Sequence, residues 1–227
     1  MNKLVLAIMA HPDDAELRCF GTLRKYQDKG YICKVIIVCA GENGISLIDK
    51  EKQEINSLDN GIRLKETREA FKKSNIEVVN LDFTDGYLVL NNKLISSIEH
   101  QIRILEPEII ITHFPDAYGV DHQDHNVVGK AVINSASRIK TVNTILLCEP
   151  LQVFRSGFIP NFFVEITDYF NSKIEALKYH ETQKGRFYLE SEFHDIRSRY
   201  YACSVGYDFA KSDKKVEVFQ LIYNFVE

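Results

Sequence analysis

Short apolar runs alternate with amphipathic segments along the first two thirds of the chain. The apolar runs, which are typical of buried strands, cover residues 4–9, 33–39, 77–81, 108–112 and 144–148. Apolar positions recur at helical spacing between them, over residues 16–29, 61–74, 94–105 and 126–137. Strands that alternate with helices build right-handed βαβ units and a mostly parallel sheet. The pattern therefore predicts a three-layer, Rossmann-like α/β fold.

The pattern changes after Pro150. It predicts a strand over residues 162–166, a helix over 168–180, a largely helical region over 187–209 and a final strand over 216–225. Thr167 has the residue type of a helix N-cap and is expected to begin the second of these elements. No segment rich in Pro, Gly or Ser interrupts the chain, so one domain over residues 1–227 is expected.

Composition narrows the class of protein. Hydrophobic residues make up 45% and charged residues 26% of the chain, and the net charge is −4. The chain therefore lacks the excess of positive charge that is typical of proteins that bind nucleic acid. The N-terminal apolar run is too short for a signal peptide, and no run approaches the ~20 residues of a membrane span, so a cytoplasmic location is expected. The five cysteines form no CxxC pair and are expected to be reduced, mostly buried, and neither disulfide-bonded nor metal ligands.

The first candidate site follows the first predicted strand. His11, Asp13 and Asp14 flank Pro12 in a turn, where ligands of open α/β sheets bind beyond the carboxyl ends of strands. Adjacent carboxylates repel each other, and a divalent cation offsets that repulsion. His11 and Asp14 can point into one cavity and leave Asp13 free to act as a base. Alternatively, Asp13 and Asp14 cap the next helix and His11 is solvated.

A second cluster follows the fourth predicted strand. Residues 112–125 contain three histidines and three aspartates at the same expected edge of the sheet. His122 and His125 are three residues apart at the start of a helix and share one face, and Asp124 can orient a ring nitrogen. His11, Asp14 and one histidine of this loop would form a two-histidine, one-carboxylate site, which is the ligand pattern of a catalytic zinc.

At these residues the sequence resembles the PIG-L/LmbE-like zinc N-deacetylases. Their first motif reads AHPDD, then one residue, then Glu, as in residues 10–16 here, and their second motif is His-x-Asp-His, as in residues 122–125. The resemblance spans nearly the whole chain. It continues through Arg63, Glu66, Ala70, Asp85, Gly86 and residues 173–183.

The resemblance implies a role for each matching residue. His11, Asp14 and His125 would bind one zinc ion per chain, and Asp13 would be the general base. His122 would stabilise the oxyanion or protonate the leaving amine, and Asp124 would orient His122. Glu42, Arg63 and Asp85 would line the sugar pocket, although Arg63 and Glu66 could instead form a solvated helix face. If Asp13 were not the base, Glu16 or Asp116 would be the alternatives.

This chain departs from the family pattern at three positions. Arg18 and Phe20 stand where small residues or glycine are usual, and Asp121 replaces a residue that is often glycine or otherwise uncharged. Arg18 could pair with Asp14 or Glu16, lie in water, or hold an anionic group of the substrate, since its planar fork suits acidic groups.

The resemblance thus implies a hydrolase that releases acetate and a free amino sugar from a small N-acetylated sugar or sugar conjugate. A homo-oligomer is possible. Two alternatives stay open from the sequence. His122 and Asp124 match the His-x-Asp of iron-dependent oxygenases, although those sites usually lie on all-β barrels. The chain could also be a non-catalytic sugar-binding protein that kept the fold.

Overall fold

One seven-stranded sheet organises the chain. The computed structural model describes residues 3–45, 57–117 and 121–226. The first five strands are parallel: β1 (Leu4–Met9), β2 (Ile32–Cys39), β3 (Glu77–Phe83), β4 (Ile109–His113) and β5 (Thr144–Cys148). β7 (Val216–Asn224) runs antiparallel between β5 and β6 (Phe162–Glu165), which gives the order β3-β2-β1-β4-β5-β7-β6. The predicted α/β class with a mostly parallel sheet and a final strand is confirmed.

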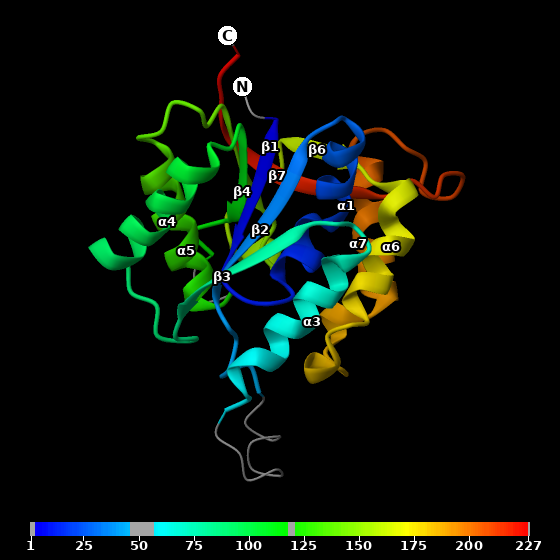
Figure 1. Ribbon diagram of the computed structural model, residues 1–227. Coiled ribbons are helices and arrows are strands. Elements are labelled where there is room, and N and C mark those ends of the chain that lie inside the picture. The colour runs from blue at the N-terminus through cyan, green and yellow to red at the C-terminus, as the bar shows by residue number, and fades with distance from the viewer. Residues whose placement is uncertain (1–2, 46–56, 118–120, 227) are drawn as a thin grey trace.

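Helices cover both faces of the sheet (Figure 1). α4 (Asn92–Leu105) and α5 (Gln123–Ala136) pack on one face and share a hydrophobic cluster with it. α1 (Asp14–Asp28), α3 (Asn60–Lys72) and α6 (Thr167–Leu177) cover the other face, and α7 (Ser191–Ser204) packs against β7. Short 3₁₀ turns complete the described elements at Val153–Arg155, Glu181–Gln183 and Phe187–Leu189.

The central strands are mostly apolar because both of their faces are covered. Every residue of β1 is buried, with Leu6 and Ile8 on the α4–α5 side and Ala7 and Met9 on the other. Fully burying such a side chain contributes about 1.5–3 kcal/mol. This explains why the sequence shows continuous apolar runs and not strict alternation.

Several predicted boundaries move by a few residues. α1 begins at Asp14 and α5 at Gln123, two and three residues earlier than the apolar periodicity indicates. Thr167 is not the N-cap of α6: Ile166 has that position, and the Thr167 hydroxyl accepts a hydrogen bond from the Lys215 backbone N–H. The hydroxyl that could have capped the helix instead binds the residue just before β7.

Strand order places both sequence clusters at one point. The chain moves outward from β1 to β2 and β3, then returns to add β4 on the other side of β1. The loops after β1 and β4 therefore leave the same edge of the sheet side by side, at a topological switch point where open α/β sheets bind ligands.

Two further expectations concern the whole chain. The cysteines are free; four are buried and Cys203 is partly exposed. Among the described residues, no helix has both the length and the apolar character needed to cross a membrane.

Candidate active site

The turn after β1 holds two acidic side chains in different environments. His11 donates its backbone N–H to Asp14 Oδ2 at 2.9 Å, which folds the turn over Pro12. Asp13 adopts the left-handed region, with φ 96°, at the N-cap position of α1, but its side chain makes no capping hydrogen bond. Instead, Asp13 Oδ2 accepts a hydrogen bond from Arg63 Nη2 at 2.9 Å. The alternative in which Asp13 caps the helix is therefore wrong.

The start of α5 positions the second pair of histidines. His122 is the N-cap, and its Nδ1 accepts the backbone N–H of Asp124 at 3.2 Å. An accepting nitrogen carries no proton, so the neutral ring has its proton on Nε2. Nearly one turn later, His125 is buried, with its Nε2 turned toward the β1 turn.

Three side chains from the two loops converge on one point. His11 Nδ1 lies 3.2 Å from His125 Nε2, and Asp14 Oδ2 lies 3.6 Å from the former and 3.3 Å from the latter. Ligand atoms bound to a tetrahedral zinc at about 2.0–2.2 Å lie about 3.3–3.6 Å from one another. The spacing of this trio matches the spacing that a zinc ion requires, so the residues present fit the metal that the resemblance implies.

Two carboxylates face the other nitrogen of His11. Asp85 Oδ1 lies 2.9 Å and Asp124 Oδ2 lies 3.3 Å from His11 Nε2. A proton on Nε2 leaves the lone pair of Nδ1 free for a metal ion, as carboxylate partners do in zinc sites. Asp124 thus contacts His122 through its backbone N–H, whereas its carboxylate faces His11 and lies 3.9 Å from His122 Nδ1.

Electrostatics favour a cation at this point. Burial lowers the pKa of His11, but Asp124, Asp14 and Asp85 raise it well above its usual value. The pKa of His125 is also raised despite burial, by Asp14 and Asp121. Carboxylates that stabilise a protonated imidazole equally stabilise a metal ion in its place.

The pKa values of the two expected acid–base groups shift in opposite directions. Burial raises the pKa of Asp13, and the Arg63 guanidinium opposes that shift. Burial and the neighbouring rings of His11 and His125 lower the pKa of His122. Asp13 is therefore moved toward the range of a useful base, and His122 is a neutral hydrogen-bond donor at pH 7.

The thiol of Cys39 also lies near His11. With His11 and Asp124 it forms a second group of side chains close enough to hold an ion. Burial raises the pKa of the Cys39 thiol strongly, and its Sγ donates to the Thr84 carbonyl. A metal ligand must be a thiolate, so the His11, Asp14 and His125 trio fits better.

The third histidine of the loop has a packing role. His113 Nε2 accepts the Ala10 backbone N–H at 2.9 Å, and its ring stacks on His125 with the centroids 4.1 Å apart. Burial lowers its pKa to about 3, so the ring is neutral. His113 thereby holds β4 against the β1 turn and supports the face of His125.

The alternative bases lie away from the site. Glu16 is fully buried and faces His180 Nε2 at 3.0 Å, whereas the Asp116 side chain is 50% exposed and lies 3.6 Å from Lys130 Nζ. The solvated helix face considered for Arg63 and Glu66 is also wrong. Arg63 is buried against the β1 turn, and Glu66 accepts hydrogen bonds from Thr182.

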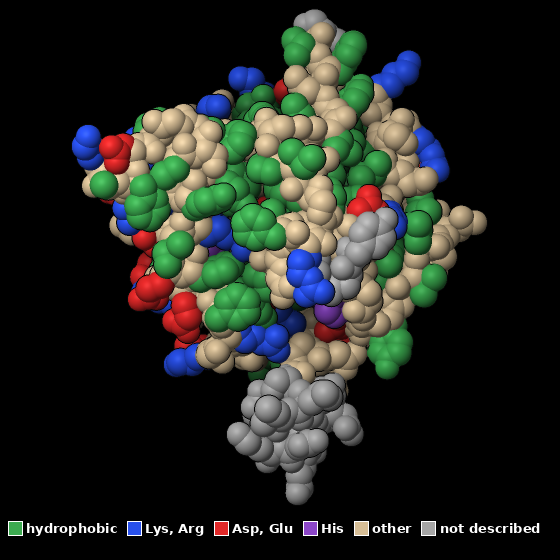
Figure 2. Space-filling view, turned by 180° about the vertical axis from the view of Figure 1, so that it is seen from behind, with side chains coloured by type: hydrophobic (Ala, Val, Ile, Leu, Met, Phe, Trp, Pro, Cys, Tyr) green, Lys and Arg blue, Asp and Glu red, His purple; other side chains and the backbone are tan. Residues whose placement is uncertain are grey.

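A cavity of about 410 Å³ opens over the trio. Arg18, Arg63 and Asp85 line it. Glu42 is not among its lining residues and instead accepts the Asp85 backbone N–H. Figure 2 shows histidine surface at this end of the molecule beside acidic and basic side chains.

Part of the cavity wall was not found from the sequence. The C-terminal region supplies Gln152, Gln183, Arg186 and Tyr188. Gln183 ends the stretch that resembles the family and so carried a signal. Gln152 and Arg186 stand in segments with no predicted element or motif, and Tyr188 lies in the region predicted only as largely helical. The return of the chain after β5 brings these three residues to the site.

Comparisons with known proteins point to one family. The sequence matches the PIG-L family, described as GlcNAc-PI de-N-acetylase, over residues 6–136. YaiS, an uncharacterized deacetylase of Escherichia coli K12, is 31% identical over 80% of this chain and 92% of its own length. A probable N-acetyl-alpha-D-glucosaminyl L-malate deacetylase 2 of Bacillus cereus is 28% identical over 81% of this chain and 84% of its own.

Two solved structures share the fold. GalB, the 4-carboxy-2-hydroxymuconate hydratase of Pseudomonas putida, has a TM-score of 0.82 at 19% identity and covers 99% of this chain and 98% of its own. The N,N′-diacetylchitobiose deacetylase of Pyrococcus horikoshii has a TM-score of 0.80 at 21% identity, over 97% and 84%. At these identities the likeness concerns the fold alone. The family match, which spans more than half of the chain, shows that this protein belongs to the PIG-L family.

Proposed function

We propose that the chain is a zinc-dependent N-deacetylase that releases acetate from an N-acetylated amino sugar or its conjugate. The observation that carries the proposal is the convergence of His11, Asp14 and His125 at zinc spacing, with Asp13 and His122 beside them on one cavity. The deacetylase names of the relatives and the family description support the reaction and the GlcNAc-like substrate class.

Asp13 would be the general base. A bound zinc ion supplies a Lewis acid for the amide carbonyl and lowers the pKa of water. Asp13 then accepts the proton of the attacking water as the C–O bond forms. Arg63 holds one carboxylate oxygen of Asp13 and is itself fixed by the Pro12 and Gly41 carbonyls, so the base is oriented before substrate arrives.

His122 would stabilise the charge that develops on the carbonyl oxygen. Its Nδ1 is occupied by the Asp124 N–H, so its Nε2–H is the available donor. The lowered pKa of His122 keeps the ring neutral, which favours hydrogen-bond donation over proton transfer. The proton that Asp13 took from water then passes to the leaving nitrogen as the C–N bond breaks.

The sugar contacts stay predictions. Arg18, Arg63 and Asp85 reach the cavity, but each is already engaged by another side chain of the site. Glu42 would act through Asp85, whose backbone N–H it binds. Gln152, Gln183 and Tyr188 add neutral hydrogen-bonding groups to the wall, and such groups suit sugar hydroxyls.

Acetate release tests the proposal. The zinc-loaded protein is incubated with a panel of N-acetylglucosamine derivatives, neutral and anionic, and acetate and free amine are measured separately. Equal amounts of the two products are expected, and both are expected to fall about 10²-fold or more in Asp13→Asn. Sugar binding without acetate release would instead support the non-catalytic alternative.

The shared fold with GalB makes a second control worthwhile, since a fold does not fix a reaction. Hydration of an unsaturated carboxylic acid by the loaded protein, with no acetate from any N-acetyl sugar, would contradict the proposal. The oxygenase alternative would need His122 and Asp124 as ligands of one ion. Asp124 and His122 do not belong to one group of candidate ligands among the described residues.

A further inference from the structure

Two of the positions at which this chain departs from the family pattern are partners. Arg18 comes from the second turn of α1, and Asp121 comes from the loop that leads into α5. Arg18 Nη2 lies 3.3 Å from Asp121 Oδ2 and 3.4 Å from Oδ1. Their side chains are only 10% and 8% exposed, so water screens the pair weakly.

Asp121 also contacts a proposed metal ligand. Its Oδ1 lies 2.7 Å from His125 Nδ1 and accepts the His122 backbone N–H at 3.0 Å. A proton on Nδ1 that faces this carboxylate leaves the lone pair of Nε2 for the point where the trio converges. The Asp121 contact therefore selects the tautomer and the ring orientation that metal binding needs.

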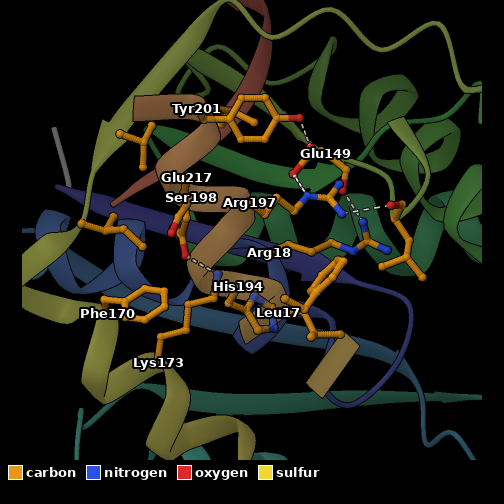
Figure 3. A pocket seen from close by; sticks show the side chains of 15 residues that line it. Leu17, Arg18, Glu149, Phe170, Lys173, His194, Arg197, Ser198, Tyr201 and Glu217 are labelled. Carbon is orange, nitrogen blue, oxygen red and sulfur yellow. Dashed lines mark hydrogen bonds and ion pairs between the residues drawn. The ribbon is translucent and has the colours of Figure 1, made fainter. Parts of the chain in front are cut away.

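Arg18 is fixed from several sides. Its Nε lies 3.6 Å from Asp14 Oδ1, and its Nη1 donates to the Glu149 carbonyl just after β5. Figure 3 shows Arg18 reaching toward Glu149, whose carboxylate Arg197 and Tyr201 hold. One guanidinium thus ties together the loops that follow β1, β4 and β5.

The charge state of Asp121 agrees with this arrangement. Burial alone would raise the pKa of the Asp121 carboxyl, but the positive charge of Arg18 and the His125 ring lower it well below its usual value. Asp121 beside the Arg18 guanidinium is therefore a carboxylate, and a carboxylate can only accept a hydrogen bond from His125.

We infer that Arg18 and Asp121 form a positioning pair, in which Asp121 holds His125 in its Nδ1–H tautomer and Arg18 holds Asp121. The pair sets the metal affinity of the site and touches neither substrate nor metal. This inference rests on the ligand assignment in the proposed function. It gives Arg18 a different role from the anion contact expected from the sequence, because the guanidinium is already neutralised by Asp121.

Zinc affinity, measured by competition with a chromophoric chelator, tests the inference without any substrate. Loss of a partner that orients a ligand lowers metal affinity about 10–100-fold. Asp121→Ala is expected to lower the zinc affinity by an amount in that range, and Arg18→Gln is expected to lower it by less. Asp116→Ala is the matched control, since it removes an exposed carboxylate from the same loop and should leave the affinity unchanged.

A double variant separates a working pair from two independent effects. If Arg18 acts through Asp121, adding Arg18→Gln to Asp121→Ala should lower the affinity little further. Nitrogen NMR of the His125 ring in the metal-free protein, recorded at a pH high enough for the ring to be neutral, provides a second measurement. The Nδ1–H form is expected in the parent and in Asp116→Ala, and a mixture of tautomers in Asp121→Ala. If Asp121→Ala fails to fold, the zinc affinity of Arg18→Gln still tests the inference.

The possible failures are distinguishable. A parent protein that binds no zinc through His125 would overturn the proposed function itself. A parent that binds zinc, together with an Asp121→Ala variant of equal affinity and unchanged tautomer, would overturn this inference alone. It would also be overturned if Arg18→Gln kept its zinc affinity and raised KM only for anionic N-acetyl sugars. That result would restore Arg18 as a substrate contact.

Discussion

The two histidines of the candidate metal site are supported in different ways. His11 follows β1, and its outer nitrogen faces two carboxylates, Asp85 and Asp124. Backbone N–H groups hold those carboxylates: Asn43 donates to Asp85, and Gly86 and Leu88 donate to Asp124. The outer nitrogen of His125 faces one carboxylate, Asp121, which is held by one backbone N–H, from His122, and by the long side chain of Arg18.

The difference indicates which histidine depends more on a single neighbouring residue. Backbone donors are fixed by the fold and lose little freedom when they bind, whereas a long arginine side chain must be ordered to hold its partner. The His11 side also has a second carboxylate when one is removed. We therefore expect the His125 side to depend more strongly on single residues, and the following predictions test that expectation.

Removal of either histidine should have the largest effect. His11→Ala and His125→Ala each delete one of three protein ligands, and metal content should fall from about one zinc per chain to near zero. Metal analysis after dialysis measures this. The parent should also lose thermal stability on chelation, since a ligand at 100 times its Kd stabilises by about 2.7 kcal/mol. Full metal content in both variants would reject the ligand assignment.

Replacement of the proposed base comes next and should separate binding from chemistry. Asp13→Asn keeps the size of the side chain but removes the proton acceptor, so turnover should fall about 10²-fold or more. Zinc content should be unchanged, because Asp13 Oδ2 faces Arg63 and not the trio. Near-normal acetate release would show that another group takes the proton.

The comparison itself is tested by matched variants on its two sides. Asp85→Ala removes one of the two carboxylates that face His11, whereas Asp121→Ala removes the single one on His125. Both should weaken zinc binding, within about 10–100-fold, and Asp85→Ala should lie at the lower end. A larger loss in Asp85→Ala would reverse the comparison and make His11 the more dependent ligand.

The smallest effect on chemistry is expected from a packing change behind the second loop. A Cβ at Gly129 of α5 would lie 2.5 Å from the His113 backbone oxygen, which cannot yield as a side chain can. Gly129→Ala should therefore destabilise the protein by about 1–3 kcal/mol, measured by denaturant unfolding. The folded fraction should keep zinc and turnover within a few-fold. Selective loss of zinc would show that α5 position controls His125 directly.

The sequence by itself determined the fold class and the two loops that form the candidate site. Continuous apolar runs separated by amphipathic segments require a sheet covered on both faces, and the structure has one. The AHPDD and His-x-Asp-His motifs led to the family, because they place metal-binding residue types directly after two of those runs. The apolar runs and the motifs each involve residues close together in the sequence, so both can be recognised without the structure.

The partners of those residues were decided only by the tertiary structure. No pattern in the sequence indicates that Arg18 contacts Asp121, which is 103 residues away. None indicates that the Asp124 carboxylate faces His11, 113 residues away, and not His122. Such contacts depend on strand order, since placing β4 beside β1 brings the two loops together. The nearest polar neighbour of a side chain is set by distances between elements, and periodicity along one element contains no record of those distances.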